Sequence, residues 1–194
     1  MAMSRRGVLA AAIELMSTGV YGRPGGSLGT KYGSTGEHGA GGERRTAAVL
    51  AKYSHDAAII HDIIVPGLSA NLDHLIVAGD SILVLDSKVW RDGFYHCLLG
   101  STLRRGLTPV DHDRREGLGR MCRMLAEHVD APVTPKLVVW PSSAKQQVMI
   151  HPSLGRQTIP IFGARHIPEL VEDHIRRHDT PNPRLVSELK DLMY

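Results

Sequence analysis

The chain has 194 residues, 42% of them hydrophobic and 22% charged, with a formal net charge of +3 at pH 7. That length and composition suit one compact domain and exclude wholesale disorder, and no apolar run reaches the length of a membrane span. The two cysteines, Cys97 and Cys122, lack the spacing of a zinc site, and we expect them to stay reduced in the cytoplasm.

The N-terminal part divides into a short helix and a glycine-rich stretch. A helix is expected at residues 5–18, and the Gly, Ser and Thr residues at 19–42 predict a linker or an ordered loop with neither helix nor strand. A second helix is predicted at 43–53, where apolar residues recur on one face. The sequence leaves open whether the glycine-rich stretch folds over a site or only tethers the first helix.

Hydrophobic patterning predicts several strands and helices after residue 56. Runs of β-branched and large apolar residues predict strands, and apolar residues repeating every three or four positions predict helices. The expected strands are residues 57–65, 71–78, 81–90, 94–103, 136–140, 147–150 and 158–162. The expected helices are residues 111–129, 167–175 and 185–192. This order is typical of an α/β fold with helices on both sides of a mixed central sheet.

The strands at 71–78 and 81–90 place acidic residues together. The Gly-Asp pair between them predicts a two-residue hairpin turn, because glycine supplies the positive φ that such turns need. Counting back from that turn along both strands puts Asp73 opposite Asp86, and alternation puts Lys88 on the face of Asp86. Like charges about 5 Å apart destabilise a sheet, so a divalent cation such as Mg²⁺ or Mn²⁺ is expected to compensate. The alternative is that both aspartates lie at a solvated edge of the sheet.

Glu43 adds a third carboxylate. It shares a helical face with Ala47, Leu50 and Ala51, where an isolated charge is costly to bury. An acid in the first helical turn, complementing the helix dipole, is the alternative interpretation. A cation held by acids beside a lysine can polarise a phosphoryl oxygen and generate hydroxide, while the lysine offsets developing charge.

These residues, taken in order, resemble a known family. Gly42-Glu43, then Leu-Asp-His-Leu-Ile-Val at 72–77 and Leu-Asp-Ser-Lys-Val-Trp at 85–90 are similar to the nuclease-related domain, NERD, of the PD-(D/E)XK restriction-endonuclease-like superfamily. The resemblance covers about residues 39–178, flanked by the N-terminal segment 1–38 and a short C-terminal helix within 179–194. It implies a restriction-endonuclease-like core of αβββαβ order.

The resemblance also implies a Mg²⁺-dependent (or Mn²⁺-dependent) phosphodiesterase. Asp73 and Asp86 would be metal ligands, Glu43 an outer ligand or water-positioning base, and Lys88 the electrostatic stabiliser. Candidate nucleic-acid contacts are basic residues near the predicted helix starts, for which a solubilising role is the alternative. They are Arg44, Arg45, Arg104, Arg105, Arg114 and Arg115.

Other interpretations were weighed against this one. The pair His61-Asp62 invites an HD-type phosphohydrolase interpretation, but such a site needs helices and residues 57–65 are strand-like. His74 is predicted to pack on the sheet face opposite Asp73. The hypothesis is therefore a metal-dependent endonuclease or nickase with DNA as its partner and no membrane. A silent nucleic-acid- or protein-binding module and an RNA-directed nuclease are the alternatives, and the oligomeric state, homodimer or complex with another protein, stays open.

Overall fold

A mixed central sheet forms the middle layer of the protein. The computed structural model describes residues 17–25, 33–98, 102–110, 115–145 and 147–193. The sheet runs in the spatial order β1 (Gly19–Tyr21), β2 (Ala58–Ile64), β3 (Asn71–Ala78), β4 (Ser81–Trp90), β8 (Val133–Pro141) and β10 (Ile161–Gly163). The pairs β2–β3 and β3–β4 are antiparallel, whereas β1–β2, β4–β8 and β8–β10 are parallel. The predicted α/β class is confirmed.

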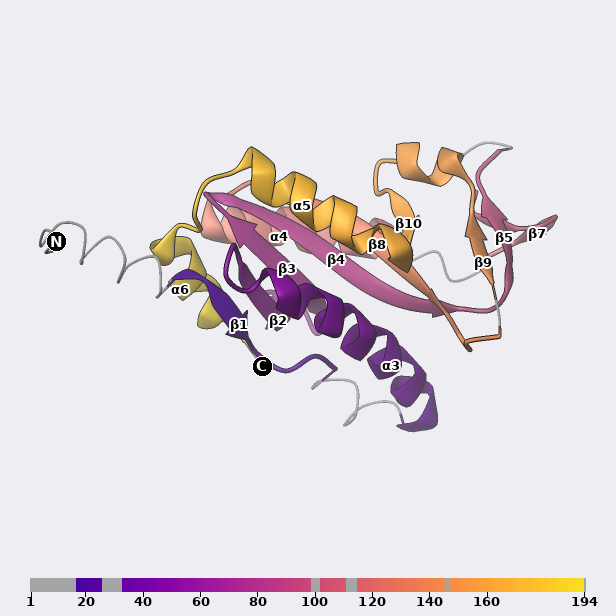
Figure 1. Ribbon diagram of the computed structural model, residues 1–194, viewed down its shortest axis with the longest axis horizontal. Coiled ribbons are helices and arrows are strands. Elements are labelled where there is room, and N and C mark those ends of the chain that lie inside the picture. Colours follow the sequence, from indigo (N-terminus) through magenta and orange to yellow (C-terminus); the bar gives the residue numbers. More distant parts are fainter. Residues whose placement is uncertain (1–16, 26–32, 99–101, 111–114, 146, 194) are drawn as a thin grey trace, which may run out of the picture.

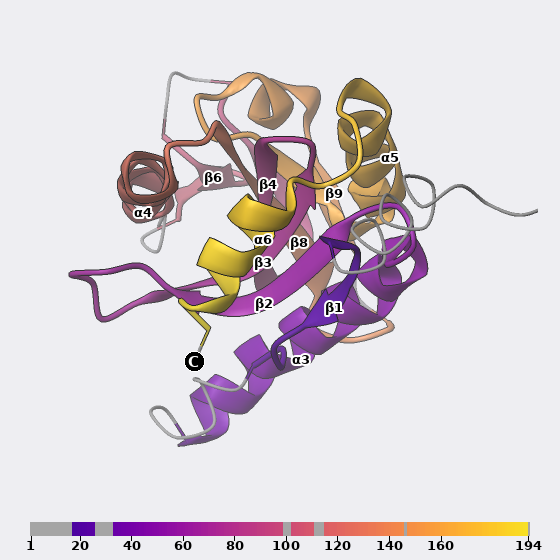
Figure 2. The same cartoon turned by 90° about the vertical axis from the view of Figure 1, so that its left-hand side faces the viewer.

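Helices cover both faces of this sheet (Figures 1 and 2). One face packs against α4 (Arg115–Val129) and α6 (Pro183–Lys190), and the other against α3 (Gly33–Leu50) and α5 (Ile167–Arg177). Buried aliphatic side chains of β2, β3 and β4 alternate between these two layers, as strand geometry requires. Three 3₁₀ turns complete the helical structure described: η1 (Ala51–Tyr53), η2 (Pro152–Arg156) and η3 (Ala164–His166).

A second, smaller sheet lies at the end of the molecule opposite α6 (Figure 1). Its strands follow the order β7 (Thr108–Pro109), β6 (Arg104–Arg105), β5 (Gly93–His96) and β9 (Val148–Ile150). The predicted continuous strand at 94–103 is therefore wrong in extent. β5 ends at His96, β6 and β7 form a separate hairpin that pairs with it, and the apolar residues Cys97 and Leu103 that suggested a strand are buried in the core.

The prediction that residues 19–42 lack helix and strand is also wrong where the structure describes them. Gly19–Tyr21 pairs in parallel with β2, and α3 begins at Gly33, ten residues before the predicted start. Both elements depend on contacts with strands distant in sequence. A Cβ on Gly42 would lie 2.8 Å from Cγ2 of Val89, so glycine permits the close approach of α3 to β4. The predicted helix at 5–18 lies, except for its last two residues, outside the described ranges.

The remaining predictions agree with the structure within a few residues. The strands predicted at 71–78 and 81–90 coincide with β3 and β4, and Gly79 has the positive φ, 52°, expected at the turn. The helix expected at 111–129 appears as α4, whose predicted first residues, 111–114, are not described. Strong hydrophobic periodicity and tight turns are local properties, which explains why these elements could be predicted.

Gly42 and Gly41 offer a matched test of the helix–sheet contact. Gly42→Ala should lower the free energy of unfolding by about 1–3 kcal/mol, since its Cβ meets Val89. Gly41→Ala meets nothing within 4 Å and should raise it by about 0.5–1 kcal/mol through helix propensity. Urea denaturation of both variants measures the difference. Equal effects would contradict the close-packing explanation.

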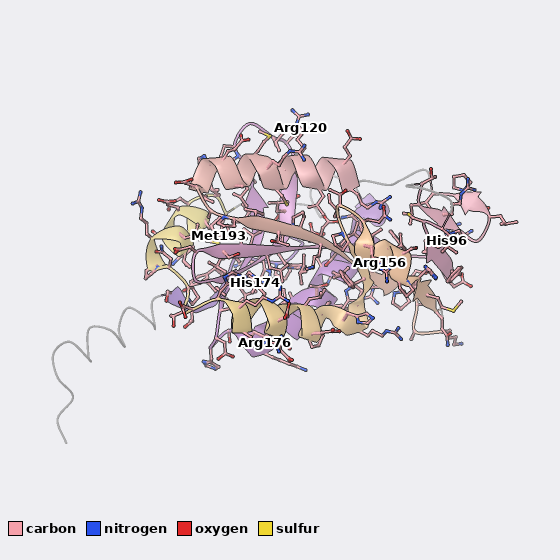
Figure 3. All side chains as sticks on the ribbon, turned by 90° about the horizontal axis from the view of Figure 1, so that it is seen from above. His96, Arg120, Arg156, His174, Arg176 and Met193 are labelled. Atoms are coloured by element: carbon pink, nitrogen blue, oxygen red, sulfur yellow. The ribbon has the colours of Figure 1, made fainter. Side chains whose placement is uncertain are left out.

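His174 predicts how stability depends on pH. It extends from α5 toward the sheet (Figure 3), where burial and the neighbouring His178 lower its pKa from 6.5 to about 4, against opposing hydrogen bonds to the backbone of Ser81 and Ile76. Between those pH values the unfolded chain binds a proton that the folded chain does not, so stability falls as the pH falls from about 6.5 to 4.

His174→Gln should remove one proton from this linkage. The slope of unfolding free energy against pH should decrease by at most about 1.4 kcal/mol per pH unit in that window. Urea titrations at several pH values measure it, with exposed His55→Gln as the control. An unchanged slope in His174→Gln would show that this side chain is not held neutral by burial.

Candidate active site

Three aspartates lie at one level of the sheet, on three neighbouring strands. The β3–β4 register runs from Ala78↔Ser81 to His74↔Leu85, as predicted, and its next step aligns Asp73 with Asp86. The β2–β3 register passes from His61↔His74 to Ile63↔Leu72, so the skipped step aligns Asp62 with Asp73. The paired ladders are thus interrupted on both sides of Asp73, where side chains replace regular strand pairing.

Lys88 is the counter-ion of these carboxylates. Its Nζ lies 2.6 Å from Oδ2 of Asp86 and 4.0 Å from Oδ2 of Asp73. Asp73 and Asp86 are only 7% and 6% exposed, and Oδ2 of Asp73 also accepts a 2.7 Å hydrogen bond from the backbone N–H of Ser87. Burial alone would lower the pKa of Lys88, but the Asp86 and Asp73 carboxylates outweigh it and raise that pKa above its ordinary value. Lys88 therefore stays charged.

Burial gives Asp73 the opposite tendency. The loss of solvent raises the pKa of its carboxyl group well above the ordinary value, and the nearby Asp86 charge raises it further, against the lowering effect of Lys88. The charged form of Asp73 is thus costly in the folded protein. This is the electrostatic state that a bound cation would relieve.

Glu43 reaches the same site from α3. It is 3% exposed, and burial raises its pKa to about 7, with Lys88 lowering it and Asp62 and Asp86 raising it. A backbone hydrogen bond from Gly25 also reaches its carboxylate. The segment after β1 therefore contacts the site. Over residues 19–25 the glycine-rich stretch does more than tether the first helix.

Asp62 belongs to the site and was not predicted there. It is 3% exposed, has a φ of 61° and accepts a hydrogen bond from Asn71. A positive φ is strained for a residue with a side chain, and such strain persists only where surrounding structure enforces it. The sequence indicates Asp62 only through the polar pair His61-Asp62 within an otherwise apolar strand.

The two histidines beside these aspartates form a buried pair. Nδ1 of His61 and Nδ1 of His74 lie 2.8 Å apart, and the rings meet edge to face. Burial lowers the pKa of His61 to about 4 and that of His74 well below its ordinary value. The prediction that His74 is packed is confirmed. An HD-type site at His61-Asp62 is excluded, because both residues lie on the strand β2 and such a site needs helices.

Hydrogen bonds fasten α3 to the strands that carry the site. Oγ1 of Thr46 lies 2.7 Å from Oγ of Ser87, and Nε1 of Trp140 donates to the same Thr46 oxygen at 2.8 Å. Thr46 is one helical turn from Glu43, and Ser87 lies between Asp86 and Lys88. These contacts therefore fix Glu43 relative to the acids and the lysine of the sheet.

The candidate nucleic-acid-binding arginines lie on separate elements. Arg44 is exposed on α3, whereas Arg45 packs over Trp140 and donates to the carbonyls of Gly41 and Pro141. On β6, Arg105 is exposed, and Nη1 of Arg104 donates to the Leu107 carbonyl at 2.8 Å. Arg115 begins α4, and Arg114 lies outside the described residues.

The donor set fits a hard divalent cation. Carboxylate oxygens suit Mg²⁺ or Mn²⁺, and Mg²⁺ commonly binds one or two carboxylates while keeping several waters. Among the described residues, no three His, Cys, Asp or Glu side chains are already arranged as a ligand group. The Lys88 ammonium lies instead beside Asp86 and Asp73, where its single positive charge offsets part of their negative charge.

Comparison with known proteins identifies the segment that carries the site. Residues 38–118 match the family model NERD, described as the nuclease-related domain. The resemblance to NERD is confirmed over this segment. The NERD match includes Glu43, Asp62, Asp73, Asp86 and Lys88, and it ends within α4, short of the expected limit near residue 178.

No curated protein and no solved structure gave a significant match. Within the part of the chain described, no helix has the length and apolar character needed to cross a membrane.

The charge balance of the candidate site predicts opposite effects of two substitutions on stability. In metal-free buffer at pH 8, Asp73→Asn should raise the free energy of unfolding by about 1 kcal/mol, because it removes a buried charge whose raised pKa opposes ionisation. Lys88→Met should lower the free energy of unfolding by about 2 kcal/mol, because it leaves the acids without their counter-ion.

Urea denaturation with EDTA measures both effects. The exposed Asp56→Asn serves as the control for a carboxylate outside the site. If Asp73→Asn were as destabilising as Lys88→Met, the acids would not be under electrostatic strain in the folded protein.

Proposed function

We propose that this protein is a metal-dependent nuclease that hydrolyses DNA phosphodiester bonds as an endonuclease or nickase. The observation that carries the proposal is the convergence of Asp73 and Asp86 on Lys88, with Glu43 buried beside them, inside a NERD segment. Opposed acids are destabilising in a sheet, so their presence favours a function that requires them. The same observation weighs against the silent binding module.

Each residue has a role in this hydrolysis. Asp73 and Asp86 would hold Mg²⁺ or Mn²⁺, with Glu43 as an outer ligand. When bound, the cation would polarise a phosphoryl oxygen and lower the pKa of a coordinated water. Glu43, whose pKa is about 7, can accept a proton from the attacking water near neutral pH. Lys88 remains protonated and stabilises the negative charge that develops on the phosphate.

The order of elements supports a restriction-endonuclease-like core. Along the chain α3 is followed by β2, β3 and β4, then by α4 and β8 when the small second sheet is left aside. This is the αβββαβ order implied by the family resemblance. A cytoplasmic location stays a prediction, which the two buried free thiols Cys97 and Cys122 support.

A plasmid assay tests the proposal. Native protein with millimolar Mg²⁺ or Mn²⁺ should nick or linearise supercoiled DNA, and EDTA should abolish this cleavage. Asp86→Asn and Lys88→Ala should each lower the rate at least about 100-fold, because each removes an interaction with the reacting phosphate or its cation. The matched controls are the exposed Asp56→Asn and Lys52→Ala.

The contrary outcomes separate the alternatives. Cleavage of RNA with intact plasmid would favour the RNA-directed nuclease. Cleavage that survives in Asp86→Asn would place the active site elsewhere. If folded native protein cuts neither nucleic acid with either metal, the hydrolytic proposal is wrong and the binding module is favoured.

A further inference from the structure

The second sheet exposes an unusual set of apolar side chains. Four of the five exposed large hydrophobic residues of the described chain belong to this sheet and its loops: Phe94 (36%), Leu98 (54%), Leu107 (89%) and Met149 (54%). Phe94 and Met149 are aligned on the neighbouring strands β5 and β9. Concentrated exposed apolar surface of this kind marks an interaction site.

Phe94 is held in place by two histidine rings. The ring centroids of His96 and His151 lie 5.3 Å and 5.7 Å from that of Phe94. His96 accepts a hydrogen bond from the N–H of Leu98 at Nδ1 and donates from Nε2 to the Gly106 carbonyl. His151 accepts from the N–H of Ser153. Phe94 therefore presents an exposed ring in a fixed position, which lowers the entropy cost of stacking on it.

The segments that form the second sheet carry an excess of positive charge. Within the described residues of 91–110 and 145–157 there are five arginine or lysine side chains and one acid, Asp92. The basic residues are Arg91, Arg104, Arg105, Lys145 and Arg156. Aromatic rings interspersed with cations are the features by which proteins bind single-stranded nucleic acid, since every base offers a stacking face and every linkage a negative charge.

The second sheet directly follows the strand that carries the candidate active site. β4 carries Lys88 and ends at Trp90, whose ring packs 4.5 Å from that of Tyr95 on β5. Phe94 follows Lys88 by six positions, so at most about 20 Å of extended chain lies between them. That span corresponds to about six stacked nucleotides. A strand cleaved at Lys88 can thus extend onto the second sheet.

We propose that the exposed face of the second sheet binds single-stranded nucleic acid on one side of the scissile phosphate. An unpaired base stacks on Phe94 beside Met149, and Arg104, aligned with His96 on the same face of the sheet, contacts the backbone. The inference rests on the proposed nuclease function and adds to it a preference for substrates with unpaired nucleotides, such as overhangs, flaps or gaps. Paired bases inside a duplex do not offer the stacking face that Phe94 requires.

Fluorescence anisotropy with a labelled 15-nucleotide oligothymidylate tests the surface directly. The titration is done in EDTA, and it is repeated with an abasic oligonucleotide of the same length, which keeps the phosphates but has no bases. The native chain should bind the oligothymidylate roughly tenfold more tightly than the abasic probe. Phe94→Ala and Phe94→Leu should both abolish that difference, and Phe94→Trp should restore it.

Two further variants separate stacking from charge. Arg104→Ala should weaken binding of both probes and reduce the slope of log affinity against log salt by about 1. Val20→Ala, which alters the fifth exposed apolar residue, on β1, should leave both affinities unchanged. Phe94→Leu keeps apolar volume at position 94, so a loss of base preference in this variant is not explained by unfolding.

The outcomes distinguish this inference from the nuclease proposal. If Phe94→Leu and Val20→Ala bind both probes like the native chain, the stacking surface is wrong even where plasmid is cut. If Phe94 governs oligonucleotide affinity but plasmid and RNA stay intact, the surface stands and the nuclease proposal fails. If Phe94→Leu changes only the sedimenting mass, the face is a contact between copies and the inference is overturned.

Discussion

The buried carboxyl groups of Asp73, Asp86 and Glu43 surround one ammonium group, that of Lys88, and the arrangement of the surrounding structure depends on that imbalance of charge. Lys88 lies 2.6 Å from Asp86 and 4.0 Å from Asp73, yet it carries a single positive charge. The folded chain therefore bears an electrostatic cost, visible in the raised pKa values of Asp73 and Glu43. A site that concentrates uncompensated negative charge is prepared to attract a cation, and stability is lost in exchange for that capacity.

The same strand connects this charge cluster to everything that positions it. β4 carries Asp86 and Lys88 and leads directly into the second sheet. It packs against α3 at Gly42 and is hydrogen-bonded to α3 at Thr46. Glu43 is consequently placed by helix–sheet packing and not by its own interactions with the sheet. The strand β5, which carries Phe94, is joined to the end of β4 by the packing of Trp90 on Tyr95.

Local signals in the sequence predicted the central hairpin and the three residues of the candidate site that lie on it, Asp73, Asp86 and Lys88. A glycine with positive φ at residue 79 defines the turn, and strand alternation then determines which side chains share a face. The register set by that turn is enough to place Asp73 opposite Asp86, with Lys88 on the face of Asp86, without any other tertiary contact. The helices α4 and α5 could be predicted for the same reason, because the helical spacing of apolar residues can be recognised within one continuous stretch of sequence.

Tertiary contacts decided what local patterns could not. The glycine-rich residues 33–42 are poor helix formers, and their helix exists because α3 packs closely on β4. Asp62 lies in the site with a strained, positive φ, on a strand whose other residues are mostly apolar. Gly25 contacts Glu43 from a segment that was predicted to be a loop. The sequence by itself thus determined the hairpin, its register and the opposed acids. The tertiary structure decided which further groups surround them, because those groups come from segments whose pairing depends on partners far along the chain.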